Sequence, residues 1–163
     1  MEPRIYWKRK LVLEMTKDVL ITLKGLQFDG TDPDGNHIET IVAGEYYIRN
    51  NSHYVMYEEV SEGFEESTRS IMKFRENYLE LTKKGLVNVH MVFEEKKKSM
   101  SSYATPYGEI MIGMDTRKVN IEEKEDQILL EVEYALEVNY EHQADCRIKV
   151  EIRSRNGNRI VLQ

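Results

Sequence analysis

The residues with the clearest chemical potential are the adjacent carboxylates Glu58 and Glu59, which follow Tyr57. Neighbouring side chains of a β-strand point to opposite faces of the sheet, so these two carboxylates cannot act together as a catalytic pair. If the segment is a regular strand, one of the two must face inward. A bulge, or a position at the rim of a barrel, would instead leave both in water. This is the polar position of the chain that most suggests a function.

An inward Glu59 could also take part in acid–base chemistry with Lys83 or Lys84 and with Tyr103. Burial would tune the pKa of such a carboxyl group. However, no spacing in the sequence pairs these residues, so we assign no catalytic residue. An enzymatic role stays open but is not favoured.

Other chemical signatures are missing from the sequence. It contains no glycine-rich phosphate loop, no zinc-protease motif and no nucleophile elbow. Residues 30–35 resemble a calcium loop but lack its first and twelfth ligands, so a hairpin loop explains them better. Cys146 lies on an apolar strand face and is interpreted as a small buried hydrophobe. No cysteine or carboxylate pattern frames the histidines, so we expect no metal and no cofactor; these histidines are His37, His53, His90 and His142.

The elements that would position these residues are β-strands, because apolar residues recur at every second position. The clearest case is residues 128–138, where six apolar side chains alternate with mostly polar ones. Residues 146–152 and 87–93 repeat the pattern. Weaker strands are predicted at residues 19–26, 38–49, 54–60, 68–75, 78–83 and 109–121.

Turn-forming residues separate these strands at Asp29-Gly30, residues 34–36, Glu62-Gly63, Glu76-Asn77, Lys84-Gly85 and Asn156-Gly157. The nearest helical segment, residues 61–67, is short and acidic. An open sheet of about eight to ten strands would leave long unpaired edges, which proteins avoid. We therefore predict an all-β fold, a single closed antiparallel up-and-down barrel, with a two-sheet sandwich as the alternative. Residues 16–163 would form the barrel, and residues 1–15 an N-terminal extension that is flexible or adds a strand.

Composition narrows the function classes. The 163 residues carry a formal net charge of −6, which argues against a nucleic-acid binder that works through positive potential. No apolar run approaches the ~18 residues of a membrane span. The single cysteine and the lack of a signal-peptide pattern lead us to expect a cytoplasmic protein.

One group of motifs carries a family resemblance. In order along the chain these are residues 44–47, residues 57–59, Lys84-Gly85, residues 103–108 and residues 130–136. Their order resembles the YwiB-like family of small bacterial β-barrel proteins, a domain-of-unknown-function family with a lipocalin-like (calycin) barrel. The resemblance covers residues 16–155 and implies a closed barrel in a cytoplasmic bacterial protein. It implies no activity, and the Gly-x-Trp motif of true lipocalins is missing.

Two non-enzymatic functions therefore lead. A small barrel can hold one small, partly apolar molecule in its mouth or interior. The predicted lining residues are Tyr57, Glu59, Met72, Phe74, Tyr103, Tyr107 and Tyr134. Alternatively the protein is a homodimer or an accessory subunit that uses an outer sheet face. This second hypothesis rests on apolar residues that cannot all be interior, namely Tyr47, Leu79, Leu81, Ile110, Ile112 and Met114.

Overall fold

The computed structural model describes residues 18–25 and 39–155, and its elements are ten β-strands. The strands are β1 (Asp18–Lys24), β2 (Glu39–Arg49), β3 (Ser52–Val60), β4 (Ser67–Arg75), β5 (Tyr78–Gly85), β6 (Val89–Glu94), β7 (Lys98–Thr105), β8 (Gly108–Glu123), β9 (Gln127–Val138) and β10 (Glu141–Ser154). This confirms the predicted all-β class. In the described part of the chain, no helix has the length and apolar character needed to cross a membrane.

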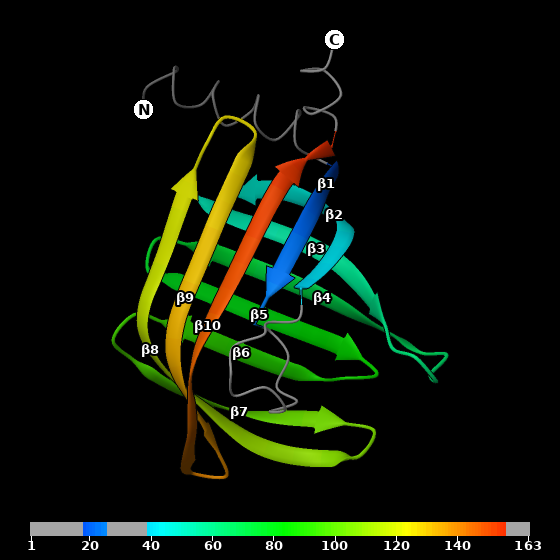
Figure 1. The fold of residues 1–163 in the computed structure, drawn as a ribbon, viewed down its shortest axis with the longest axis vertical. Coiled ribbons are helices and arrows are strands. Elements are labelled where there is room, and N and C mark those ends of the chain that lie inside the picture. Colours follow the sequence, from blue (N-terminus) through cyan, green and yellow to red (C-terminus); the bar gives the residue numbers. More distant parts are fainter. Residues whose placement is uncertain (1–17, 26–38, 156–163) are drawn as a thin grey trace.

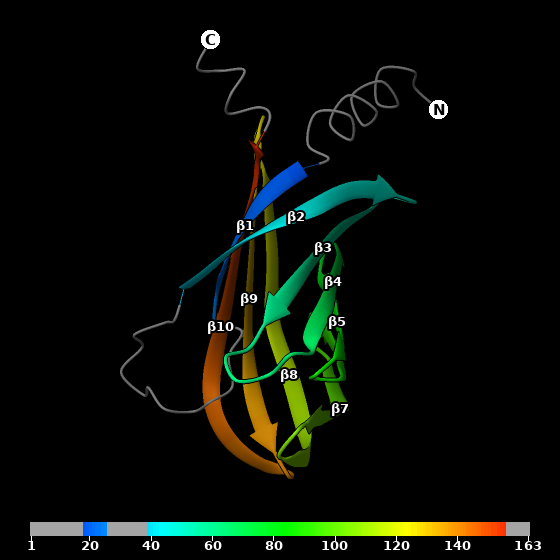
Figure 2. The same ribbon diagram turned by 90° about the vertical axis from the view of Figure 1, so that its right-hand side faces the viewer.

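The strands form one antiparallel sheet that curls into a nearly closed barrel (Figure 1). The order of the strands in the sheet is β6-β5-β4-β3-β2-β1-β10-β9-β8-β7. The first and last strands in the sequence, β1 and β10, are therefore paired with each other. Figure 2 shows the long strands β8–β10 on one side of the interior and β3–β5 on the other. The barrel prediction is confirmed, and the two layers are parts of one continuous sheet.

The seam of the barrel lies between β6 and β7, which follow each other in the sequence but form no ladder. A single bridge crosses it, in which the backbone N–H and C=O groups of Asn88 and Ala104 bond reciprocally at 2.9 Å. At the other end of the seam, Lys96 N–H donates to the Thr116 carbonyl at 2.8 Å.

The alternating stripes meet in one shared core. Its largest fully buried side chains are Tyr46, Tyr134, Phe74, Phe93, Ile21 and Met72. Four of the six apolar residues considered for an outer face also lie in this core, namely Leu79, Leu81, Ile112 and Met114. Tyr47 is half-buried and Ile110 is exposed, so the outer face is less apolar than the sequence suggested.

Several turns are built from residues that tolerate a positive φ. Asn50 and Asn51 have φ values of 51° and 64°, as a type I′ hairpin requires, and they join β2 to β3. Asn77, with φ 64°, forms the predicted reversal between β4 and β5. Residues 61–66 form a loop with no helical turn. The turns predicted at residues 29–36 and 156–157, and the extension at residues 1–15, lie outside the described residues.

Two features of the strands differ from the sequence-based expectation. Strand β7 was not predicted, because its sequence has no clear apolar alternation and it has a full ladder only with β8. Strand β8 contains a bulge between Thr116 and Lys118. The bulge shifts the inward positions from even to odd numbers, so that Met114 and Val119 both face the core.

Candidate functional site

A polar cluster lies on the inner face of three neighbouring strands at one end of the barrel. The ladders between β3, β4 and β5 place Tyr57 opposite Ser70, and Ser70 opposite Lys83. One step nearer the strand ends, Glu59 lies opposite Thr68. Each of these positions lies an even number of residues from a buried core residue in the same strand. Their side chains therefore point inward, as those of the core residues do. We call the end of the barrel at which β3 ends and β4 begins the mouth.

The centre of the cluster is an ion pair between Lys83 and Glu59. The Lys83 Nζ atom lies 2.8 Å from Glu59 Oε1, and the Ser70 hydroxyl donates to the same oxygen at 3.0 Å. The side chains of Lys83 and Glu59 are 11% and 28% exposed, so the carboxylate is the more accessible partner. Pairing and hydrogen bonding together offset the cost of removing both charges from water.

The pKa values of two tyrosines are affected by the charge of Glu59. Burial raises the pKa of Tyr57, the nearby Glu59 carboxylate raises it further, and the neighbouring Ser70 side chain lowers it in part. Burial and the Glu59 carboxylate, in the same order, raise the pKa of Tyr103. Both phenols are therefore protonated at neutral pH and can donate a hydrogen bond. The Tyr57 hydroxyl is buried and has no hydrogen-bond partner among the described residues.

The unpartnered hydroxyl makes Tyr57→Phe a stabilising substitution in the ligand-free protein. A buried polar group without a partner costs free energy, so we expect the free energy of unfolding to rise by about 1 kcal/mol, as measured by urea unfolding. The matched control is Tyr46→Phe, because the Tyr46 hydroxyl does bond His53 at 2.7 Å. That substitution should lower the free energy of unfolding by about 1 kcal/mol. Equal losses from both would contradict the assignment of Tyr57 as unpartnered.

Comparisons with known proteins place this barrel in a family. The family described as Domain of unknown function (DUF1934) matches residues 21–150. The chain belongs to the DUF1934 family. The crystal structure of the ywiB protein from Bacillus subtilis resembles the fold with a TM-score of 0.70. At 18% identity, the match covers 89% of this chain and 96% of that one, and it shows the fold alone. No curated protein gave a match.

The DUF1934 match spans the whole mouth cluster, and the motif at residues 105–108 forms the β7–β8 turn beside the mouth. Thr105 organises this turn, since its hydroxyl donates to the Gly108 carbonyl at 3.0 Å and accepts from Tyr107 N–H at 3.1 Å. The family resemblance predicted from the sequence is thus confirmed, and one of its motifs is explained by turn geometry.

The predicted lining residues of this DUF1934 member separate into three groups. Met72, Phe74 and Tyr134 are fully buried in the core, and Tyr57 is nearly so. Glu59 and Tyr103 are partly buried. Tyr107 is 87% exposed in the β7–β8 turn and does not line the interior, because a turn residue follows no inward alternation.

Of the two lysines considered beside Glu59, the one that reaches it is Lys83. Lys84 points to the other face of β5 and is exposed. Sequence reasoning did not include Ser70 or Thr68, although both lie on the same parity as Met72 and Phe74. That parity was the available signal. Cys146 packs against the core, and burial raises the pKa of its thiol, which disfavours the reactive thiolate.

A second polar group of this DUF1934 member lies at the opposite end of the barrel. His53 bonds the Tyr46 hydroxyl through Nδ1, lies 3.4 Å from Glu123 through Nε2, and stacks on Phe74 with ring centroids 4.8 Å apart. Sequence reasoning missed this group, although His53 shares the parity of Val55.

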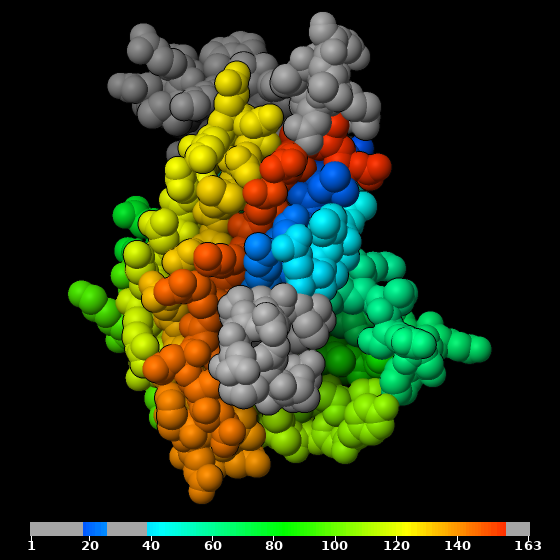
Figure 3. Space-filling model, viewed as in Figure 1, coloured from blue at the N-terminus to red at the C-terminus, as the bar shows by residue number. Residues whose placement is uncertain are grey.

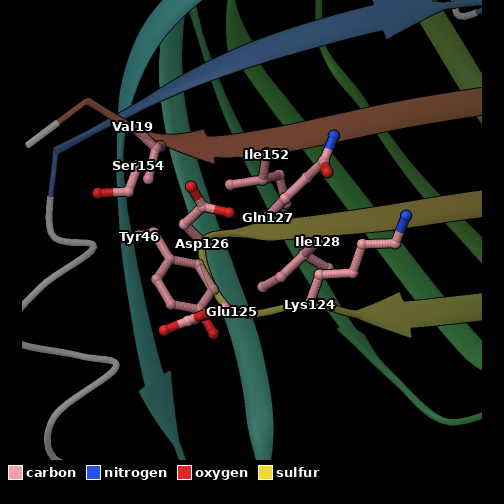
Figure 4. Close-up of a pocket in the computed structure, with 9 residues that line it drawn as sticks. All are labelled: Val19, Tyr46, Lys124, Glu125, Asp126, Gln127, Ile128, Ile152 and Ser154. Carbon is pink, nitrogen blue, oxygen red and sulfur yellow. The ribbon is translucent and has the colours of Figure 1, made fainter. Parts of the chain in front are cut away.

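The hollow next to this second group is small. Figure 4 shows Tyr46 beside the β8–β9 turn, with Glu125 and Ile128 close to its ring. The hollow has a volume of about 20 Å³, which is room for roughly one water molecule. We therefore interpret the His53 group as a structural tie between β2, β3 and the end of β8.

Proposed function

We propose that this protein binds a small, partly apolar molecule at the mouth of the barrel, without catalysing a reaction. The observation that carries the proposal is the Glu59–Lys83 pair, a partly exposed polar anchor on the inner face of a largely apolar interior. Ligand sites combine apolar walls with a few convergent polar groups, and this is such a combination.

The depth of the ligand follows from the packing below the cluster. Met72 and Phe74, in the middle of the barrel, have no surface exposed to solvent. Side chains therefore fill this part of the interior. A ligand therefore rests at the level of Glu59 and Tyr103, with its apolar part directed along the rim. A small barrel either fills with side chains or holds one small molecule. Here side chains fill the middle, and we place the ligand above them, at the rim.

The test is native mass spectrometry of freshly purified protein, followed by extraction of any retained small molecule. We expect the wild-type protein to retain one, and Glu59→Gln to retain about tenfold less, because a hydrogen bond to a charged group is lost. Glu58→Gln is the matched control: it changes the neighbouring carboxylate, which faces outward and pairs with Arg69 at 3.7 Å. It should retain the molecule at the wild-type level.

Two results would contradict the proposal. One is that neither co-purified material nor a fragment library binds the wild-type protein. The other is that Glu58→Gln reduces binding as strongly as Glu59→Gln, which would indicate an effect of net charge and not of a site.

The alternative proposal is a homodimer or accessory subunit that uses an outer sheet face. It is favoured by Leu20 and Ile41, which lie on the outer faces of the paired strands β1 and β2 and are 36% and 62% exposed. Light scattering distinguishes the two proposals. A dimer that Ile41→Glu converts to a monomer supports the interface, and a wild-type monomer at high concentration contradicts it. In both proposals we place the protein in the cytoplasm, because its one cysteine cannot form an internal disulfide.

A further inference from the structure

The mouth cluster is rich in hydrogen-bond acceptors. Besides the Glu59 carboxylate, it contains the Ser70 oxygen and the unpartnered Tyr57 oxygen, both of which can accept an N–H. Its one cation is Lys83, which is more buried than Glu59 and already donates to it. A ligand that brings donors therefore completes the cluster better than one that brings acceptors.

Tyr57 makes this more than a group of acidic residues. Its side chain is 4% exposed and its hydroxyl has no partner in the described part of the chain. It lies two positions from Glu59 on the same face and directly opposite Ser70, which bonds Glu59. A buried polar atom without a partner beside a partly open ion pair marks a place where an external group can bind.

The β3–β4 loop adds negative charge at the mouth. Residues 61–66 include Glu62, Glu65 and Glu66, all exposed, and none of them belongs to an ion pair among the described residues. The exposed cations of the neighbouring strands, Arg69 and Lys84, lie on the outer face of the sheet. Clustered charges of one sign attract counter-ions and repel like-charged ligands. The loop therefore favours approach of a cation.

An aromatic pair bridges two connections at the mouth. Phe64 in the β3–β4 loop and Tyr107 in the β7–β8 turn meet edge to face, with ring centroids 6.2 Å apart. Their side chains are 36% and 87% exposed, although large aromatic groups are usually buried. Figure 3 shows the surface hollowed between this loop and this turn, with atoms of the green strands at its floor. Exposed aromatic rings can cover an apolar body and also attract a cation.

We propose that the ligand is an organic amine with an apolar body. This inference rests on the proposed function. The ammonium group bonds the free side of the Glu59 carboxylate and the Tyr57 oxygen, while the apolar body lies against Phe64 and Tyr107. Lys83 holds the carboxylate in place and is not the ligand's partner.

The experiment compares three probes that share one tail and differ only in the head group: hexylammonium, 1-hexanol and hexanoate. Binding is followed by protein NMR titration at pH 7.5 and low salt. We expect hexylammonium to bind about tenfold more tightly than 1-hexanol, and hexanoate to bind most weakly, as hydrogen bonds to charged groups imply. Glu59→Gln should remove the preference for the ammonium head, and Glu58→Gln should keep it. Phe64→Ala should weaken the ammonium and alcohol probes by the same factor.

The outcomes separate this inference from the proposed function. If hexanoate binds most tightly and Lys83→Met abolishes its binding, the ligand is an anion, so the amine class is wrong while the binding function stands. Equal binding of all three heads would also overturn the amine class alone. If no probe binds and no co-purified molecule is found, both proposals fail. Thermal unfolding of each variant, followed by circular dichroism, verifies that loss of binding is not loss of fold.

Discussion

Replacing Phe74 by alanine is expected to lower the free energy of unfolding by about 3–5 kcal/mol. The ring is fully buried in the middle of the barrel, so its removal loses apolar burial and leaves a cavity that the closed sheet cannot collapse to fill. It also removes the surface on which His53 stacks with ring centroids 4.8 Å apart. The loss therefore extends to the bond between His53 and Tyr46. Urea unfolding measures the change.

The control for this prediction is Phe64→Ala. Phe64 is 36% exposed and lies in a loop, so its removal should change the free energy of unfolding by less than about 1 kcal/mol. A similar small loss for Phe74→Ala would mean that the barrel interior rearranges freely. That result would weaken the inference that packing confines a ligand to the mouth.

Replacing Gly44 by alanine should cost at least about 2 kcal/mol, which is within the range for overpacked interiors. Gly44 lies on the inner side of β2, opposite Val19 and Tyr57. An added Cβ would lie 2.5 Å from the Met56 carbonyl oxygen and 2.6 Å from the Ile21 Cδ1 atom. The first of these atoms belongs to the backbone, so relief requires a shift between β2 and β3. This shift would also displace Tyr57, and we expect binding at the mouth to weaken.

Gly113→Ala is the matched control, because Gly113 is also a strand glycine without a positive φ. The nearest atom to its added Cβ is the Met100 Sδ, at 2.8 Å, at the far end of a flexible and partly exposed side chain. Alanine also restricts the unfolded chain more than glycine, which favours folding by about 0.4–1 kcal/mol. We expect a change in free energy of unfolding near zero. If Gly44→Ala and Gly113→Ala behave alike, the tight approach of β2 to β3 is not what makes Gly44 necessary.

The fold could be predicted from the sequence to a large extent, because alternation in one strand is a local property. Residues 128–138 alternate regularly enough to predict a half-buried strand from the segment alone, and the structure has β9 there. Strand β7 could not be found in this way. It lies at the seam, and its side chains are mostly partly exposed, so its sequence carries little of the apolar signal.

The site could be predicted only in part. Alternation singled out Glu59 as a residue that could face inward, and the structure places it there, at the rim and partly exposed. Alternation could not show whether Lys83 or Lys84 is the partner of Glu59, because this depends on the register of β5 against β4. Tyr107 was expected to line the mouth or the interior, and the structure places it in the β7–β8 turn, 87% exposed.

By itself, the sequence determined the strand class, most of the strand positions and the shared interior, because each follows from the two-residue repeat of side chains along one strand. The tertiary structure alone decided which polar residues meet. Ser70 and Lys83 lie 11 and 24 positions from Glu59 in the sequence, and the three residues become neighbours only through the pairing of three strands. The position of the seam between β6 and β7, and hence the shape of the mouth, was also decided at that level. Pairing between distant strands depends on which faces the whole sheet must bury, and no single segment carries that information.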